Sequence, residues 1–192
     1  MEEITIKAYK ASELSKGAQE LLATEYEDIN LRIDREWDSP LIEGIKEELA
    51  LYGIEDPEIT WSGFYSQGDG LSFTFDLIDT DIFIRKLYEE GHITDENTVI
   101  ESKNMHVFSR RATHRYCHEK SVLLGVNYEG TDNIDISQLT NRINIWKENR
   151  CRIFYSQLEK QYEELSTIEN IIATLDETGF LFTPSGKRIY TQ

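Results

Sequence analysis

Three polar side chains, Ser66, Gln67 and Asp69, gather in a glycine-rich turn that joins two strand-like segments. Ser66 and Asp69 supply acceptor oxygens, Gln67 supplies an amide that donates and accepts, and the glycines leave the backbone amides free to turn. Successive amides in such a turn can form an anion-binding concavity. Alternatively, Gln67 and Asp69 bond to the backbone of their own turn, as in Asx turns. The turn is not a phosphate loop, because the lysine and the Ser/Thr of that motif are missing.

A basic island at residues 101–120 is the second place where chemistry is expected. Side chains of a strand alternate between its two faces. We expect the arginines of this island to pair with carboxylates of the N-terminal helices, although arginine suits a phosphate equally well. One face of a strand over 105–116 carries His106, Phe108, Arg110, Ala112, His114 and Tyr116, and the other carries Arg111, Thr113 and Arg115. The alternative to internal pairing is a pocket for a phosphate-bearing small molecule, built from Arg110, His114, Arg115 and the stacking face of Trp61 or Tyr116.

Metal binding and nucleophilic catalysis are not predicted. His114, Cys117, His118 and Cys151 match no closed zinc pattern. Adjacent residues of a strand point to opposite faces, so Cys117 and His118 do not form a nucleophile pair. The common hydrolase and metalloprotease motifs do not occur, and we expect no catalytic residue and lean against an enzyme. The candidate residues for binding a ligand or partner are Trp61, Ser66, Gln67, Asp69, Arg110, His114, Arg115 and His118.

The composition predicts a folded, acidic protein. The chain has 192 residues, a formal net charge of −16 and 39% hydrophobic residues, which fits one domain with a substantial core. Such a surface repels nucleic acid and anionic membranes and favours a basic partner. The carboxylates either form a solvated acidic face or line up in rows that imitate DNA. No apolar run reaches the roughly 18 residues of a membrane span, the N-terminus lacks a secretory signal, and the two cysteines fit a reducing cytoplasm.

These residues must be positioned by an α+β fold in a single domain over 1–192, in which helices flank an antiparallel sheet of hairpins. The main helical signal is an apolar stripe over 135–165, which includes Trp146 as a core residue and is interrupted by Arg150. In the 71–78 strand, one face carries apolar residues and the other carries polar ones. Strands are expected at 4–9, 59–66, 71–78, 105–116, 121–128, 180–183 and 187–190, and helices at 12–36, 40–52, 80–91, 135–165 and from the capping box at 166–169 to Gly179.

Three blocks of the sequence carry a resemblance to a known family. The first runs from Ile59-Thr60-Trp61-Ser62-Gly63-Phe64 into Ser66-Gln67-Gly68-Asp69-Gly70, the second is the Arg/His-rich segment 111–118, and the third covers 155–165, 180–183 and 186–188. In this order they resemble small bacteriophage proteins labelled "antitoxin of toxin–antitoxin stability system". After Gly70 that family tends to carry small and acidic residues, where this chain has Leu71-Ser72-Phe73-Thr74-Phe75. The resemblance implies a phage or prophage accessory protein that works in the host cytoplasm, in host takeover or counter-defence.

Two functions are compatible with these observations. The preferred hypothesis is a non-catalytic, antitoxin-like protein that binds and inhibits a host protein or nucleoprotein complex through its acidic surface. The alternative is a binder (sponge) or hydrolase of a nucleotide-type small molecule held between the 61–70 turn and the 106–118 strand. We expect no direct nucleic-acid binding, no membrane association, no metal and no cofactor, and a homodimer is compatible with the sequence.

Overall fold

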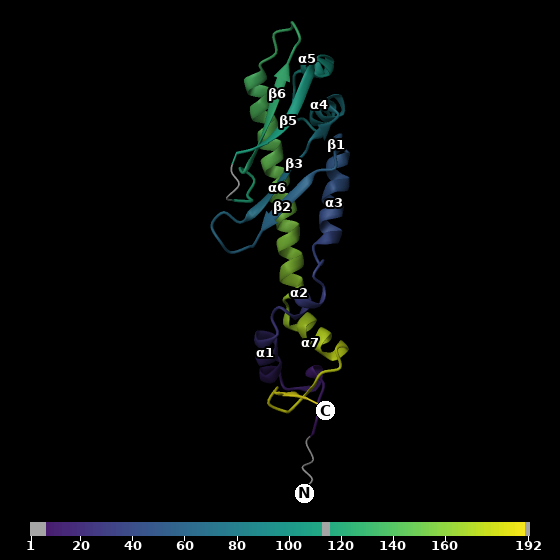
Figure 1. Ribbon diagram of the computed structural model, residues 1–192, viewed down its shortest axis with the longest axis vertical. Helices are drawn as coiled ribbons and strands as arrows, with labels where there is room; N and C mark the ends of the chain where they lie inside the picture. The colour runs from purple at the N-terminus through teal and green to yellow at the C-terminus, as the bar shows by residue number, and fades with distance from the viewer. Residues whose placement is uncertain (1–6, 113–115, 191–192) are drawn as a thin grey trace. The chain divides into compact units, whose positions relative to one another are not determined.

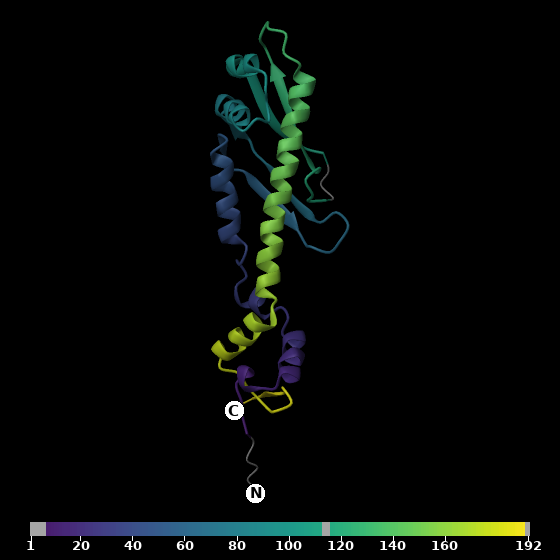
Figure 2. The same cartoon turned by 180° about the vertical axis from the view of Figure 1, so that it is seen from behind.

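The computed structural model describes residues 7–112 and 116–190 and confirms the predicted α+β class, with helices and antiparallel strand pairs (Figures 1 and 2). The chain forms two compact units, one of residues 1–38 and 160–192 and one of residues 39–159. The expectation of a single domain over 1–192 stays a prediction. None of the described helices combines the length and the apolar character that crossing a membrane requires.

The larger unit contains the predicted turn and the described part of the basic island. Its elements in chain order are α3 (Ser39–Ala50), β1 (Ile54–Glu55), β2 (Glu58–Ser62), β3 (Gly70–Thr74), β4 (Leu77–Ile78), α4 (Thr80–Glu89), α5 (Glu96–Ile100), a 3-10 turn (Ser102–Asn104), β5 (Met105–Arg111), β6 (Val122–Tyr128) and most of α6 (Ile136–Leu165). The strands pair antiparallel as β1 with β4, β2 with β3 and β5 with β6. The long helix predicted over 135–165 is therefore confirmed.

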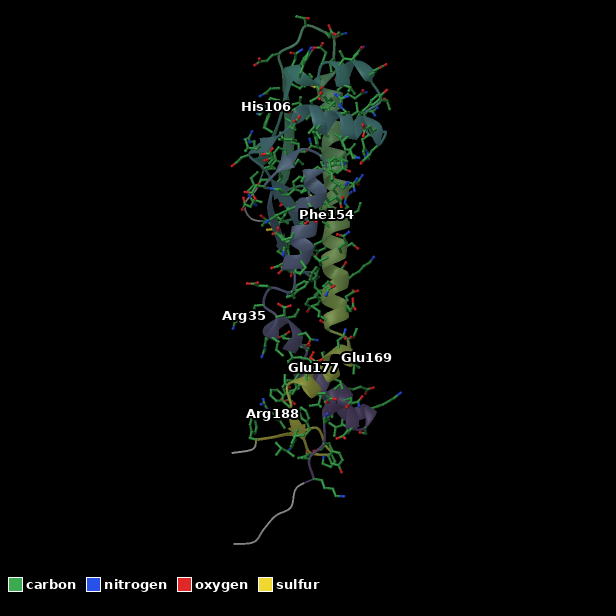
Figure 3. The ribbon with its side chains drawn as sticks, turned by 90° about the vertical axis from the view of Figure 1, so that its right-hand side faces the viewer. Arg35, His106, Phe154, Glu169, Glu177 and Arg188 are labelled. Atoms are coloured by element: carbon green, nitrogen blue, oxygen red, sulfur yellow. The ribbon has the colours of Figure 1, made fainter. Side chains whose placement is uncertain are left out.

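Trp146 of α6 lies in the core of the larger unit, as predicted. Its buried ring is 4.8 Å from that of Tyr52, 5.1 Å from that of Phe83 and 6.4 Å from that of Phe73, measured between centroids. These three rings come from the turn that follows α3, from α4 and from β3. Phe154, labelled in Figure 3, is completely buried farther along the same helix. The apolar stripe of α6 is thus the surface on which the other elements pack.

Side chains of α6 occupy the outer edge of β6, which runs alongside the helix in Figures 1 and 2. The Leu124 amide donates to Asn144 Oδ1 at 2.9 Å, and Asn144 Nδ2 donates to the Leu124 carbonyl at 2.8 Å. One turn later, Lys147 Nζ donates to the Val122 carbonyl at 2.5 Å and also to the Glu119 carbonyl. Lys147 is completely buried, and this burial lowers its pKa. Backbone groups that would otherwise stay open at this edge are therefore satisfied by the helix.

On the other side of the hairpin, Ser109 joins β5 to the chain after β3. Its hydroxyl accepts the Phe75 amide at 3.0 Å and donates to the Phe75 carbonyl at 2.8 Å. A side chain thus replaces a backbone ladder at this junction, and the hairpins remain separate two-stranded pairs.

The smaller unit has its own core around Leu22, Ile171, Leu175 and Phe182. The buried Asn30 side chain ties its helices together: Nδ2 donates to the carbonyl at the end of α6, and Oδ1 accepts the hydroxyl of a residue on α7, each at 2.5 Å. The elements are a 3-10 turn (Ala11–Glu13), α1 (Lys16–Glu25), α2 (Ile29–Ile33), α7 (Ile168–Glu177), β7 (Leu181–Phe182) and β8 (Arg188–Ile189), with β7 and β8 forming the predicted terminal hairpin.

The helix predicted over 12–36 is wrong as one element, because it is broken into the 3-10 turn, α1 and α2. The Ser15 hydroxyl accepts the Ala18 amide at 3.4 Å and caps the start of α1. A second break follows Tyr26, and α2 then carries Asn30 to its partners on α6 and α7. Local capping and long-range hydrogen bonds therefore override a helical periodicity that spans both segments.

The predicted strands are too long in several places. The strand expected over 59–66 ends at Ser62, that over 105–116 ends at Arg111, and that over 71–78 is split into β3 and β4. Ser72 is buried, the reverse of what the alternation predicts, because β3 is covered on both faces. Leu77 is exposed, because the chain leaves the strand after Thr74 and the alternation does not continue into β4. The short elements β1 and α5 were not predicted, since so few residues show no periodicity. Of the strand expected over 4–9, residues 4–6 lie outside the described residues.

Candidate functional site at the 63–69 turn

The turn predicted to carry chemistry connects β2 and β3, whose last facing pair is Ser62 and Gly70. Residues 63–69 therefore form a seven-residue connection (by this register), far longer than the two residues of a tight hairpin. Gly63, Gly68 and Gly70 have φ values of 24°, 95° and 155°, which other residues rarely adopt. The glycines are thus needed for the backbone path of the loop.

Asp69 holds this loop together from inside. Its Oδ2 accepts the backbone amides of Ser66 at 2.6 Å and Tyr65 at 3.1 Å, and its Oδ1 accepts the Ser62 hydroxyl at 3.3 Å. The Asp69 amide in turn donates to the Ser66 carbonyl at 3.1 Å. Of the two interpretations of Asp69, the geometry supports the one in which its carboxylate bonds the backbone of its own turn, although it accepts amides that precede it, whereas an Asx turn uses one that follows. The carboxylate occupies the amides that an anion would have needed.

An aromatic cluster supports the base of the loop. The ring of Phe64 lies 5.4 Å from that of Trp61 and 5.4 Å from that of Tyr155 on α6. The Tyr155 hydroxyl donates to the Gly63 carbonyl at 2.6 Å. Burial, followed by the nearby Asp69 carboxylate, raises the pKa of Tyr155 to about 12, so this hydroxyl stays protonated and keeps donating at neutral pH. The loop is therefore anchored to the long helix as well as to itself.

The chain after β5 packs against the other side of the loop. A Cβ atom on Gly68 would lie 2.3 Å from the Tyr116 ring, and one on Gly70 would lie 2.7 Å from the Cα of His118. The rings of Tyr116 and His118 stack with centroids 5.9 Å apart. The carbonyl of the next residue, Glu119, accepts from the buried Lys147. Glycine at these two positions lets the loop and the 116–118 segment approach closely. Helix α6 contacts both segments, the loop through Tyr155 and the chain after His118 through Lys147.

The tip of this loop is presented to solvent. Ser66 and Gln67 are exposed, and Tyr65 is 78% exposed. An aromatic ring, a hydroxyl and an amide on a backbone fixed by Asp69 make a preorganised contact surface, because little loop entropy is lost on binding. Tyrosine is also among the residues that most often dominate binding energy at interfaces.

The structure brings together five of the eight predicted site residues: Trp61, Ser66, Gln67, Asp69 and His118 belong to the loop or to the segment packed on it. Arg110 is exposed on β5. His114 and Arg115 lie outside the described residues, so the nucleotide pocket that needs them stays a prediction.

The expected partners of the arginines require a correction. Arg111, not Arg110, points towards β2, where its guanidinium donates to the Thr60 hydroxyl at 2.8 Å and lies 3.6 Å from the Glu58 carboxylate. Internal pairing therefore does occur for Arg111, but with a strand residue and not with the N-terminal helices. The strand alternation places Arg110 on the opposite face.

Tyr65, Phe64 and Tyr155 were not predicted as part of the site. The first two stand inside the motif and could have been found as aromatic residues in an otherwise polar turn. Tyr155 is 92 residues away from the carbonyl that it binds, and no local pattern reveals such a contact.

The described residues contain no group of three or more His, Cys, Asp or Glu side chains arranged to hold a metal ion. Cys151 is buried, and this burial raises the pKa of its thiol to about 12, which makes it a poor nucleophile.

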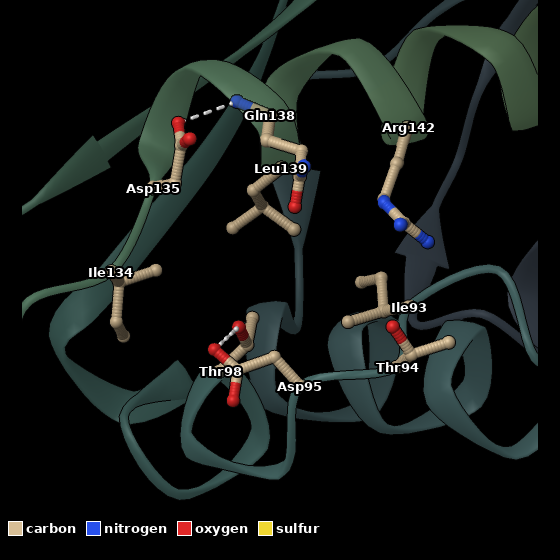
Figure 4. A pocket seen from close by; sticks show the side chains of 9 residues that line it. All are labelled: Ile93, Thr94, Asp95, Thr98, Ile134, Asp135, Gln138, Leu139 and Arg142. Atoms are coloured by element: carbon tan, nitrogen blue, oxygen red, sulfur yellow. Dashed lines mark hydrogen bonds between the residues drawn. The ribbon is translucent and has the colours of Figure 1, made fainter.

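A small cavity of about 50 Å³ lies between α5 and the start of α6 (Figure 4). Asp95 and Asp135, which face it, cap their own helices by accepting the amides of Asn97 at 3.1 Å and Gln138 at 2.9 Å. Arg142 donates to the backbone carbonyl of His92 at 3.1 Å. The charged side chains of the cavity are thus used in holding the fold, and its small volume suits ordered water better than a substrate.

Comparison with known proteins assigns the chain to a family. The model of a domain of unknown function, DUF8835, matches residues 37–167, more than half of the chain. The chain belongs to the DUF8835 family. The DUF8835 match covers the whole 39–159 unit and so includes the loop, Tyr116, His118 and Tyr155. No curated protein and no solved structure matches the chain significantly.

Proposed function

We propose that this DUF8835 protein is a non-catalytic binding protein that recognises a basic surface of a host protein, with the 63–69 loop as a principal contact. It would act as a phage-encoded, antitoxin-like factor in the host cytoplasm and inhibit or sequester its partner. The observation that carries the proposal is the loop itself. Its only carboxylate is committed to the backbone amides of Tyr65 and Ser66, while its tip stays exposed.

The arrangement of the loop favours binding over catalysis. A general acid or base needs a side chain within hydrogen-bond reach of a reacting atom, yet Asp69 is directed inward and Tyr155 holds the Gly63 carbonyl. A formal charge of −16 supports a basic partner, because complementary charge accelerates and orients association. The resemblance to phage antitoxin-like proteins adds a setting in which small inhibitors of host complexes are expected.

A matched pair of tyrosines tests the proposal. Tyr65 and Tyr190 are each 78% exposed, so replacing either by alanine removes an equally accessible ring. Tagged wild-type protein, Tyr65→Ala and Tyr190→Ala would be used for affinity capture from host lysate, with quantitative mass spectrometry of proteins and small molecules. We expect a specific protein to be retained by the wild type and by Tyr190→Ala and lost with Tyr65→Ala. The purified partner should then be inhibited by the wild type and by Tyr190→Ala, but not by Tyr65→Ala.

Two results would contradict the proposal. Equal capture by Tyr65→Ala and Tyr190→Ala would remove the loop from the contact. A nucleotide that co-purifies and is lost in Gln67→Ala, with no protein partner, would support the small-molecule alternative instead.

A further inference from the structure

The smaller unit contains a groove that the loop does not explain. It has a volume of about 430 Å³ and lies between the α1–α2 junction and the chain that follows α7. Its apolar floor and wall include Tyr26, Ile29, Phe180 and Ile33. Tyr26 and Phe180 pack on the core of the unit, so the floor is supported from below. Ile33, in contrast, is 59% exposed. The volume is in the range of sites that enclose large apolar groups.

The rim of the groove is acidic. Glu25 and Glu27 are exposed, and Asp28 pairs with Arg32 at 3.2 Å. The guanidinium of Arg32, which lines the groove, is therefore balanced by Asp28, and Glu25 and Glu27 form no ion pair with any of the described residues. An apolar floor with a negatively charged rim is complementary to an apolar side chain flanked by lysine or arginine.

We propose that this groove binds a basic amphipathic helix of a partner protein, with an apolar side chain seated against Ile33 and Phe180 and basic residues facing Glu25 and Glu27. This is the helix-in-groove mode, in which apolar anchors recur at helical spacing. The inference rests on the proposed function only in treating the chain as a binding protein. The groove is a different surface from the 63–69 loop.

The position of the groove in the sequence indicates what it adds. Its lining residues lie at 25–33 and 178–180, outside the DUF8835 match at 37–167. The loop is thus part of the family domain, whereas the groove is built by segments on either side of it. The groove therefore supplies a second contact surface, built from residues outside the family domain.

A synthetic probe tests the groove without knowledge of the partner. The probe is a fluorescent helical peptide about four turns long, with leucine at positions i, i+3, i+4 and i+7 and lysine elsewhere. A peptide with glutamate in place of lysine is the charge control. Binding to the full chain would be followed by fluorescence anisotropy at low and high salt. We expect the lysine peptide to bind, more weakly as salt rises, and the glutamate peptide not to bind.

Matched variants locate the binding. Ile33→Ser should weaken binding of the lysine peptide roughly tenfold, because the anchor loses its apolar contact. Leu21→Ser is the control, since Leu21 is 66% exposed on α1 but does not line the groove. Glu25→Gln with Glu27→Gln should weaken binding about two- to fivefold. Glu20→Gln with Glu169→Gln changes the net charge equally and should have little effect; Glu169 is labelled in Figure 3.

Three outcomes would overturn the inference. The first is that the lysine peptide does not bind. The second is that the control variants weaken peptide binding as much as the groove variants do, which would mean non-specific attraction to the acidic surface. The third is that the chain forms a dimer, detected by sedimentation, that Ile33→Ser abolishes, which would make a second copy the occupant. Tyr65→Ala should bind the peptide like the wild type. The two proposals can therefore fail independently: the loop is tested by Tyr65→Ala and the captured host protein, and the groove by Ile33→Ser and the lysine peptide.

Discussion

Replacement of Arg150 by methionine is the sharpest stability test that the structure offers. The Arg150 guanidinium donates to Glu48 at 2.9 Å and to Glu90 at 3.2 Å, and also to the Tyr52 hydroxyl. The same hydroxyl donates to Glu90 at 2.8 Å. One guanidinium therefore bridges two carboxylates and fixes a tyrosine next to the core tryptophan. Methionine keeps an unbranched apolar stem on the stripe of α6 but removes the guanidinium from both acids, which leaves Glu90 with Lys86 at 3.9 Å.

The expected loss follows from the exposure of the cluster. Breaking a buried ion pair costs roughly 3–5 kcal/mol, whereas an exposed pair contributes about 0–1 kcal/mol. The Arg150 side chain is 23% exposed, so we expect a loss in unfolding free energy between these limits, about 2–3 kcal/mol. For a chain of this length that corresponds to a fall in Tm of roughly 4–12 °C.

Arg152→Met is the control, because Arg152 lies on the same helix and also contacts two acids. Its guanidinium is 3.1 Å from Glu119 and 3.3 Å from Glu148, but its side chain is 52% exposed. We expect a loss below about 1 kcal/mol. Urea unfolding followed by tryptophan fluorescence would measure both variants, since Trp146 lies beside Tyr52. Equal losses for the two variants would refute the reasoning that partial burial sets the value of these pairs.

Two further predictions concern the loop and the alkaline limit of stability. Gly70→Ala should destabilise the fold by about 2 kcal/mol or more, as measured by thermal unfolding, because φ is 155° and the new Cβ would lie 2.7 Å from the backbone of His118; an unchanged Tm would mean that the 116–118 segment does not pack there. Burial and the hydrogen bond to Glu90 raise the pKa of Tyr52 to about 12, whereas the phenol of the unfolded chain loses its proton near pH 10. The stability that this tyrosine contributes should therefore be complete below pH 10. It should fall by at most about 3 kcal/mol as the pH rises to 12. Tyr52→Phe should make urea midpoints less dependent on pH in this window, and an identical pH dependence in the variant would contradict the assignment.

The sequence predicts well wherever a long period or a backbone requirement dominates. The helix expected over 135–165 is found at Ile136–Leu165, because thirty residues with a 3.6-residue stripe leave little ambiguity. Helices also end where Gly53 and Gly179 follow them, and both glycines have positive φ. In contrast, the break between α1 and α2 depends on Asn30 reaching partners 135 and 144 residues away. Such hydrogen bonds leave no local trace.

The candidate site shows the same division. The glycines and polar residues of the 61–70 segment predict the turn and allow two roles for Asp69. Only the three-dimensional structure, in which Asp69 accepts the amides of Tyr65 and Ser66, distinguishes an anion site from a carboxylate that bonds its own loop. Arg150 interrupts the stripe of α6, which signals a polar partner, yet its acids lie 102 and 60 residues away. A sequence can therefore indicate that a charge on an apolar stripe needs a partner, but it does not say which residue that partner is.

The side chains that seal β6 also limit how this protein can recognise others. Many binding domains receive an extended peptide as an additional strand, which needs an open edge with unpaired backbone groups. At β6 the amide and carbonyl of Leu124 are already bonded to Asn144, and the Val122 carbonyl is bonded to Lys147. A peptide would have to displace a buried lysine to pair there. Main-chain addition at Val122 and Leu124 is therefore closed, so a partner that approaches this part of the edge must be recognised through side chains.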